Sequence, residues 1–288
     1  MPIAVVTFQF DPYAHLVGDL VVRWGTIALA TVIAVALILA GVRARAVGLR
    51  ADDVPFVAIG IVPGAVIGGR LGYLILHAGY YGSTPARLLD PSLGGLELGL
   101  AVVGGFLTGS YVASLLGDSV GSWLYVAATP VLFALGAGKL TMVLTGTGQG
   151  SPSTAEWATA YLGPGPWGSL LPALPSIPSQ AIEGVATLAI LVVLTVTLLL
   201  GLFGRGDGRV FFVGIGLWAV ARALVSTTWR DPVVAAGLNA GGLIAAGIAI
   251  GCAVGLVMLT VRPGPAERRS RDEGTDVVWP DPETRPRF

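Results

Sequence analysis

Long apolar runs alternate with shorter polar connections along most of this chain. Seven runs are long enough to cross a hydrocarbon core, which takes about 20 apolar residues in a helix. We expect spans at Val21–Val42, Val54–Leu76, Leu98–Leu116, Ser122–Leu144, Ala181–Phe203, Val210–Thr228 and Leu238–Val261. The pattern predicts an all-α integral membrane protein in which a seven-helix domain (21–261) follows an N-terminal segment (1–20). The polar, proline-rich tail (262–288) is expected to be disordered.

The arginines outside the spans predict the orientation of the chain. They concentrate after the first and fifth spans and at the start of the tail, at Arg43, Arg45, Arg50, Arg205, Arg209, Arg262, Arg268, Arg269 and Arg271. Because arginine-rich loops stay in the cytoplasm, we expect these segments and the C-terminus inside and the N-terminus outside. A short arm (77–97) and a long loop (145–180) rich in Gly, Pro, Ser and Trp then lie on the outer side.

Composition supports a protein of the lipid bilayer and excludes several classes of partner. Hydrophobic residues make up 54% and charged residues 12% of the chain, and the mean hydropathy is +0.79. A formal net charge of zero argues against a nucleic-acid partner. One cysteine, Cys252, and two scattered histidines, His15 and His77, are too few for a metal centre, and no cofactor is expected.

Glycines recur every four residues in three of the spans. They are Gly60, Gly64, Gly68 and Gly72 in the second span, Gly105 and Gly109 in the third, and Gly247, Gly251 and Gly255 in the seventh. Small residues at this spacing let helix backbones approach closely, so packing is favoured over a chemical role. Pro63 and Pro130 are expected to bend their helices.

Lys139 is the only lysine of the chain and lies within the fourth span. A charge within a span costs about 2.5–3.5 kcal/mol and typically faces a bundle interior or a wet cavity. Alternatively, the side chain extends its amine to the nearby headgroups. Lys139, Arg70 and Arg222 all lie five or six residues before the outer ends of their spans. This spacing places the three cations roughly 8–9 Å below the outer surface.

Two carboxylates accompany these cations, because Glu97 and Glu183 open the third and fifth spans from the same side. A shared polar pocket near the outer leaflet accounts for this clustering better than scattered, independent snorkelling. Three cations against two carboxylates leave surplus positive charge, which suits an anionic ligand such as a phospholipid headgroup. Arginine binds phosphate through paired hydrogen bonds, whereas lysine acts as a compact point charge.

Several segments resemble the motifs of the prolipoprotein diacylglyceryl transferase family, in the order and spacing of that family from about Phe10 to Val261. FDPYAHLVGDLVVRWG resembles the family's opening, and DDVPFVAIGIVPGAVIGGRLGYLIL its second span. LELGLAVVGGFLTG resembles "EGGLAIHGGLIGG", and GAGKLTMVLTGTGQG falls on the signature "GxGRxGNFxNGxxxG". IPSQAIEG resembles "HPxQLYEG", and GRVFFVGIGLWAVARALV resembles the sixth span.

The resemblance implies a multi-pass enzyme of the bacterial plasma membrane that acts in lipoprotein biosynthesis. Such enzymes transfer diacylglyceryl from phosphatidylglycerol to the lipobox cysteine thiol in the signal peptide of a prolipoprotein, and release glycerol phosphate. The motif matches imply Lys139, Arg222 and Glu183 as catalytic residues. The implied phospholipid-binding residues are Arg70, Lys139, Arg222, Tyr73, Gln180, Gly104, Gly105 and Gly150.

The chain departs from the family pattern at six motif positions, one of which is Gly25, where a tyrosine usually follows Trp24. Lys139 stands for an arginine, Thr141 and Met142 stand for Gly-Asn, and Val103 and Ile177 stand for two histidines. Without these imidazoles, Glu97 or Glu183 is the expected acceptor of the thiol proton. Two alternatives to a transferase stay open: a catalytically silent homologue that binds anionic phospholipid, and a transporter of small anions.

Overall fold

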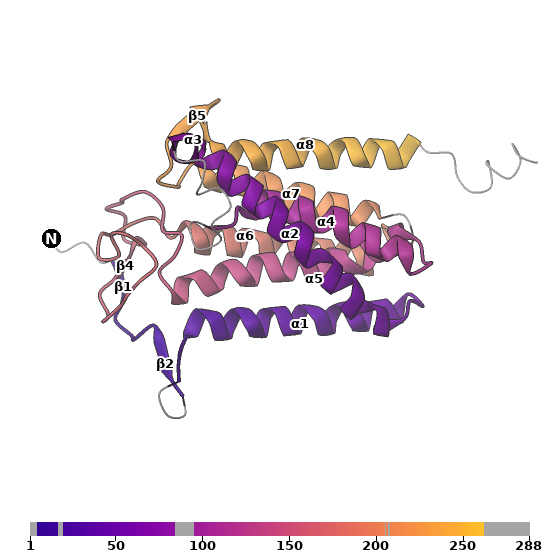
Figure 1. The fold of residues 1–288 in the computed structure, drawn as a ribbon, viewed down its shortest axis with the longest axis horizontal. Helices are drawn as coiled ribbons and strands as arrows, with labels where there is room; N and C mark the ends of the chain where they lie inside the picture. Colours follow the sequence, from indigo (N-terminus) through magenta and orange to yellow (C-terminus); the bar gives the residue numbers. More distant parts are fainter. Residues whose placement is uncertain (1–4, 17–19, 84–94, 205, 207, 262–288) are drawn as a thin grey trace, which may run out of the picture.

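Seven long helices form the body of the computed structural model, which describes residues 5–16, 20–83, 95–204, 206 and 208–261 (Figure 1). They are α1 (Trp24–Ala46), α2 (Val54–Leu76), α4 (Leu98–Leu115), α5 (Val120–Thr141), α6 (Ser179–Leu199), α7 (Arg209–Ser226) and α8 (Ala240–Val261). All seven are long and apolar enough to cross a membrane. The seven predicted spans are therefore confirmed as helices, and the protein is a multi-pass membrane protein.

Short elements gather at one end of the bundle. Strand β1 (Val6–Phe8) pairs in parallel with β4 (Thr159–Tyr161), β2 (Tyr13–His15) pairs antiparallel with β3 (Val21–Arg23), and β5 (Val233–Ala235) pairs antiparallel with β6 (Leu238–Asn239). Helix α3 (Ala78–Ser83) lies at the same end (Figure 1). We call this the strand end and the opposite end the far end. The all-α prediction missed these strands, because two- or three-residue strands leave no periodic pattern in the sequence.

The helix ends differ from the predicted spans by up to about one turn. The first span begins later than predicted, because Val21–Arg23 is a strand and Arg23 keeps an extended backbone (φ −68°, ψ 135°). It also ends later, so α1 includes Arg43 and Arg45. The predicted arm (77–97) is helical over α3, but its residues 84–94, like the tail (262–288), lie outside the described residues.

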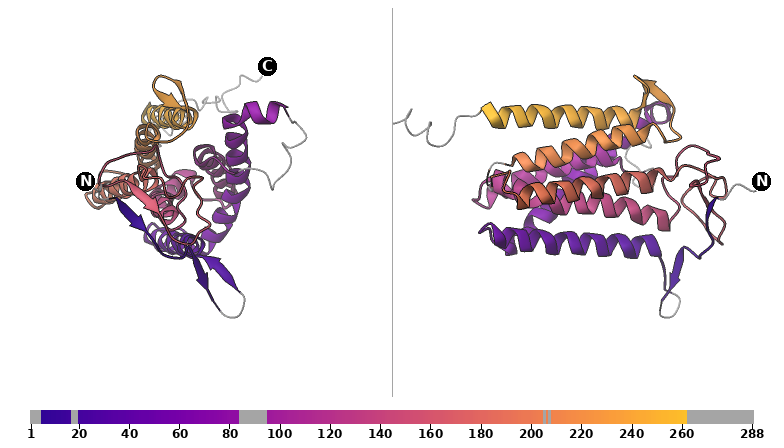
Figure 2. Two further views of the ribbon diagram at one scale, coloured as in Figure 1. Left: turned by 90° about the vertical axis from the view of Figure 1, so that its left-hand side faces the viewer. Right: turned by 180° about the vertical axis from the view of Figure 1, so that it is seen from behind.

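Helix α7 lies at the centre of the bundle, whereas α1 and α8 lie at its edges. Nine of the 18 residues of α7 are buried, against three of 23 in α1 and four of 22 in α8. Viewed along the bundle, α1 and α8 occupy opposite edges (Figure 2, left). The central core packs Trp218 and Ile215 of α7 against Leu132 of α5 and Leu194 of α6. Because α7 is the most enclosed helix, a charge on it must find its partners inside the protein.

The glycine pattern is confirmed for α2 and α4, which form the closest helix pair. Gly64 and Gly104 face each other so closely that a Cβ on either would collide with the carbonyl oxygen of the other. The same prediction is wrong for two glycines of α8. Gly247 and Gly251 face open space, with no heavy atom within 4 Å of a Cβ built there, whereas Gly255 packs against the ring of Phe212.

Pro130 interrupts the hydrogen bonds of α5, and an arginine of α1 occupies the carbonyl that it frees. A proline has no N–H to donate to the carbonyl four residues earlier, which here is that of Val126. Nε of Arg43 donates to this oxygen at 3.3 Å, and its Nη2 donates to the oxygen of Tyr125 at 3.2 Å. The guanidinium also lies over the Tyr125 ring. This arginine therefore fastens α1 to α5 near the far end.

Candidate functional site

Four charged side chains meet near the strand end of the bundle, and we call them the charge cluster: Glu97, Lys139, Glu183 and Arg222. Nζ of Lys139 lies 2.9 Å from Oε2 of Glu183. Nη1 of Arg222 donates to Oε1 of Glu183 at 2.6 Å, and its Nη2 donates to Oε1 of Glu97 at 3.1 Å. Glu183 therefore joins the cations of α5 and α7, and Arg222 joins the two carboxylates.

Local helix geometry holds each member of the charge cluster in place. Glu97 is the N-cap of α4, where its oxygens accept from the backbone N–H groups of Gly99 and Leu100, both at 2.7 Å. Its own N–H donates to the carbonyl of Gly69, which ties the start of α4 to α2. Lys139 lies in the last turn of α5. A carboxylate at a helix N-terminus and a cation at a C-terminus are both favoured by the helix dipole.

The charge cluster is nearly sealed from solvent. The exposed fraction is 1% for Glu183, 4% for Arg222 and 5% for Glu97. Buried ions are tolerated when they are paired, and removing one partner typically costs several kcal/mol. Two cations balance two carboxylates here, so the surplus of positive charge expected from the sequence is absent from these four residues.

Aromatic rings and unpaired donors surround the cations. The Trp229 ring lies 4.8 Å from the guanidinium carbon of Arg222 and 5.8 Å from Nζ of Lys139. Within the described residues, Nε of Arg222 and Nε1 of Trp218 are buried donors without an acceptor. Buried polar groups are usually paired. Each of these donors, one on the Arg222 cation and one on the Trp218 ring 5.9 Å from its guanidinium carbon, is able to donate a hydrogen bond to a ligand oxygen.

The loop between α5 and α6 packs over the strand end. Tyr161 of β4 is stacked on Phe8 of β1, and the Gln180 amide donates to its hydroxyl at 3.4 Å. Burial raises the pKa of Tyr161 to about 12, so the phenol keeps its proton further into the alkaline range than an exposed tyrosine does. Arg230 fastens the loop by donating to the carbonyl of Gly150 at 2.7 Å and to Oγ of Ser176 at 2.8 Å.

The other predicted site residues occupy varied positions. The guanidinium of Arg70 lies over the ring of Tyr73, one turn along α2, and that ring stacks on His77. Gly104 and Gly105 face α2, and Gly150 packs against Ser179 and Thr228. Thus Lys139, Glu183, Arg222 and Glu97 share direct ion contacts, whereas the described contacts of these glycines are packing contacts.

Three residues that help to form the site carried too weak a signal in the sequence: Trp229, Arg230 and Tyr161. Trp229 and Arg230 follow the end of α7, and each lies beside a segment distant in sequence. The available clue in the sequence was a tryptophan seven residues after Arg222, because cations commonly lie over a tryptophan ring. No local pattern pairs Arg230 with a carbonyl 80 residues away.

The structure shows the contacts of three residues that differ from the family motifs: Val103, Ile177 and Met142. Val103, at one family histidine position, lines an apolar cavity of about 520 Å³ between α4, α7 and α8. At the other, the Ile177 carbonyl accepts the N–H of Gly150 at 2.7 Å, a contact that any residue type can make. The Met142 side chain lies against Gly148. On α4, the apolar side chain of Val103 therefore stands among apolar neighbours where the family has an imidazole.

Comparison with known proteins gives a consistent result. Relatives named phosphatidylglycerol–prolipoprotein diacylglyceryl transferase include one from Geobacter sulfurreducens, 30% identical over 162 residues, covering 54% of this chain and 62% of the relative. One from an Azoarcus species is 34% identical over 174 residues, covering 57% and 63%. One from Thermus thermophilus is 29% identical over 155 residues, covering 51% and 56%. The matched regions span less than two thirds of these relatives.

The family comparison extends much further along the chain. The family model described as prolipoprotein diacylglyceryl transferase matches residues 12–260, which includes the seven spans, apart from the last residue of α8, and the four residues of the charge cluster. Together with the bacterial relatives, the seven spans identify a multi-pass bacterial membrane protein. The match over nearly the whole helical bundle shows that this chain belongs to the prolipoprotein diacylglyceryl transferase family.

Proposed function

We propose that this protein transfers diacylglyceryl from phosphatidylglycerol to the lipobox cysteine of a prolipoprotein signal peptide. The strand end faces outward and the C-terminus lies in the cytoplasm, because the arginine-rich connections lie at the far end. The substrates are then a bilayer lipid and a membrane-bound peptide, with no nucleic acid among its partners. Both reach the charge cluster from the outer side.

One observation carries the proposal: Lys139, at the signature position of the family, is paired inside a buried cluster that also holds Arg222. Departure of glycerol phosphate puts negative charge on a phosphate oxygen. Fixed cations in a water-poor site stabilise such charge more strongly than water does. The unpaired Nε of Arg222 and Nε1 of Trp218 supply further donors.

The proposed reaction balances as a displacement at carbon. The cysteine thiolate attacks the glyceryl carbon that carries the phosphate, a C–S bond forms, and the C–O bond breaks with its electron pair left on the phosphate oxygen. The thiol proton must leave first, because the thiolate is the nucleophile. Glu183 and Glu97 are the carboxylates within the cluster, and we assign the proton to one of them. Arg70, Tyr73 and Gln180 are proposed to contact the lipid at the rim.

The test uses purified protein with phosphatidylglycerol and a lipobox peptide. We expect diacylglyceryl-peptide and glycerol phosphate in equal amounts. Lys139→Ala should abolish both products, whereas Lys139→Arg should preserve or raise them, because arginine can grip phosphate with two hydrogen bonds. Ala189→Leu on the exposed face of α6 is the control for a substitution within a span. Folded protein that binds the lipid and yields neither product would rule out the transferase.

A second function, lipid binding without turnover, is favoured by one observation. Val103 lines an apolar cavity where the family has a histidine, so no imidazole can act there. The two functions differ in the effect of restoring that side chain. Val103→His should raise the rate of a slow transferase, and should leave a silent lipid-binding protein without product.

A further inference from the structure

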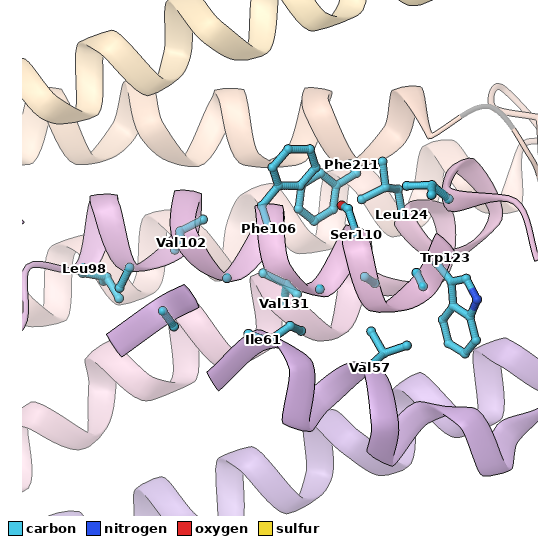
Figure 3. Close-up of a pocket in the computed structure, with 17 residues that line it drawn as sticks. Val57, Ile61, Leu98, Val102, Phe106, Ser110, Trp123, Leu124, Val131 and Phe211 are labelled. Carbon is cyan, nitrogen blue, oxygen red and sulfur yellow. The ribbon is translucent and has the colours of Figure 1, made fainter. Parts of the chain in front are cut away.

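An elongated apolar cavity of about 230 Å³ runs along α4 between α2, α5 and α7 (Figure 3). Its lining begins at Leu98, next to Glu97 of the charge cluster, and continues along α4 to Ala113. At 1.5 Å per residue these positions span roughly 22 Å. One leaflet of a hydrocarbon core is roughly 15 Å deep, so the cavity is long enough for an extended acyl chain.

Small residues explain why the cavity exists. The lining carries Gly105 and Gly109 on α4 and Ala127 on α5, whose lack of bulk leaves space beside the Ile61 side chain that packs on the two glycines. An empty cavity costs stability in proportion to its volume, and an apolar one stays dry. Hydrocarbon is the occupant that fits such a lining inside a membrane.

The inner end of the cavity differs from the rest of its lining. Trp123, 5% exposed, lies there with an indole N–H that has no acceptor among the described residues, and the hydroxyl of Ser110 is likewise unpaired. In Figure 3 the labelled side chains run from Leu98 along α4 to Ser110, with Trp123 beyond. The indole ring of Trp123 blocks this end of the cavity, and the two unpaired polar atoms are unfavourable neighbours for the terminal methyl group of an acyl chain.

We propose that this cavity binds one acyl chain of the phospholipid whose phosphate lies at the charge cluster, and that Trp123 sets the length of chain accepted. The proposal rests on the proposed function for the place of the headgroup. Proximity supports it, because Leu98 lines the cavity and directly follows Glu97, the carboxylate that accepts a hydrogen bond from Arg222. Transfer from bilayer to cavity gains little hydrophobic free energy, since both are apolar. Selection by length therefore comes from overpacking against the Trp123 ring.

Photolabelling tests the position of the chain without relying on activity. Full-length protein in nanodiscs is given phosphatidylglycerol that carries a diazirine either at the end of one 16-carbon chain or next to the glycerol. The terminal probe should label residues near Ser110 and Trp123, and the other probe residues near Leu98. Ala127→Leu narrows the cavity and should cut the terminal label about tenfold. Ala189→Leu, on the exposed face of α6, should leave it unchanged.

Two results would overturn the proposal. One is a terminal label that Ala127→Leu does not reduce. The other is a label on Ile244 and Gly251, which would place the chain in the second cavity, between α4, α7 and α8. The predicted labelling without any transfer product would keep the acyl site and reject the transferase.

A chain-length series measures the role of Trp123. We expect transfer to fall about tenfold once the chain exceeds the cavity, and Trp123→Ala to move that limit to longer chains. If this variant does not fold, Ala127→Leu should move the limit to shorter chains. If product formation does not depend on acyl-chain length in any variant, selection by length is rejected while the proposed transferase activity still stands.

Discussion

Glu183→Gln removes one charge from the centre of the charge cluster with little change of shape. Glu183 is 1% exposed and accepts Nη1 of Arg222 at 2.6 Å, with Nζ of Lys139 at 2.9 Å. Loss of one partner from a buried ion pair costs about 3–5 kcal/mol, because the remaining charge is left buried without compensation. At about 2–4 °C per kcal/mol for a chain of comparable size, the apparent Tm should fall by roughly 6–20 °C.

The assay is thermal unfolding in a neutral detergent, followed by intrinsic fluorescence. Glu156→Gln, in the exposed part of the loop between α5 and α6, is the matched control and should change stability by less than about 0.5 kcal/mol. Phosphatidylglycerol should raise the Tm of Glu183→Gln more than phosphatidylcholine does, because phosphatidylglycerol has a net negative charge that compensates the surplus cation, whereas the choline group of phosphatidylcholine offsets its own phosphate. A Tm within about 1 °C of the wild type would refute the pairing, and equal effects of the two lipids would refute an anion site.

Three further predictions concern packing, pH and the loop. Gly64→Ala should destabilise the protein by roughly 1–3 kcal/mol through collision with α4, whereas Gly247→Ala, in open space, should be neutral or slightly stabilising in thermal unfolding. Burial raises the pKa of Tyr161 from 10 to about 12, so the folded state holds the phenol proton more tightly than the unfolded state. The free energy of unfolding should therefore fall as pH rises from 10 to 12, and in Tyr161→Phe this part of the decrease should be absent. Arg230→Ala removes the hydrogen bond to the carbonyl of Gly150 and should increase amide hydrogen exchange in residues 150–177. Unchanged exchange would show that Arg230 does not hold the loop between α5 and α6 in place.

Apolar length was enough to predict the helices. Each predicted span overlaps one observed helix, because a bilayer forces buried backbone groups into helices and the span lengths follow from its thickness. The ends were less predictable. Val21–Arg23 is as apolar at its start as the helix that follows, yet it pairs with Tyr13–His15 instead. That choice depends on a partner strand, which no local pattern encodes.

Shared depth predicted the contacts within the charge cluster. Lys139, Glu183 and Arg222 share a height in the bundle, and they are in contact. Arg70 shares the predicted height, but height alone does not fix the direction in which a side chain points. Gly68 packs on α4, and a residue two positions further along a helix lies about 200° around its axis. Arg70 therefore lies on a different side of α2 from its packing glycines.

The pairing inside the charge cluster limits how a phosphate can bind. Arg222 uses one N–H of Nη1 for Glu183 and one N–H of Nη2 for Glu97, and its Nε has no acceptor among the described residues. An ammonium has three donors that rotate freely, and Lys139 directs Nζ to Glu183. A phosphate oxygen shared by Nε of Arg222 and Nζ of Lys139 would leave both carboxylates in place. In that arrangement the ammonium of Lys139 supplies one hydrogen bond to the phosphate, and an arginine at this position would add a second, which is why Lys139→Arg is expected to preserve or raise the activity.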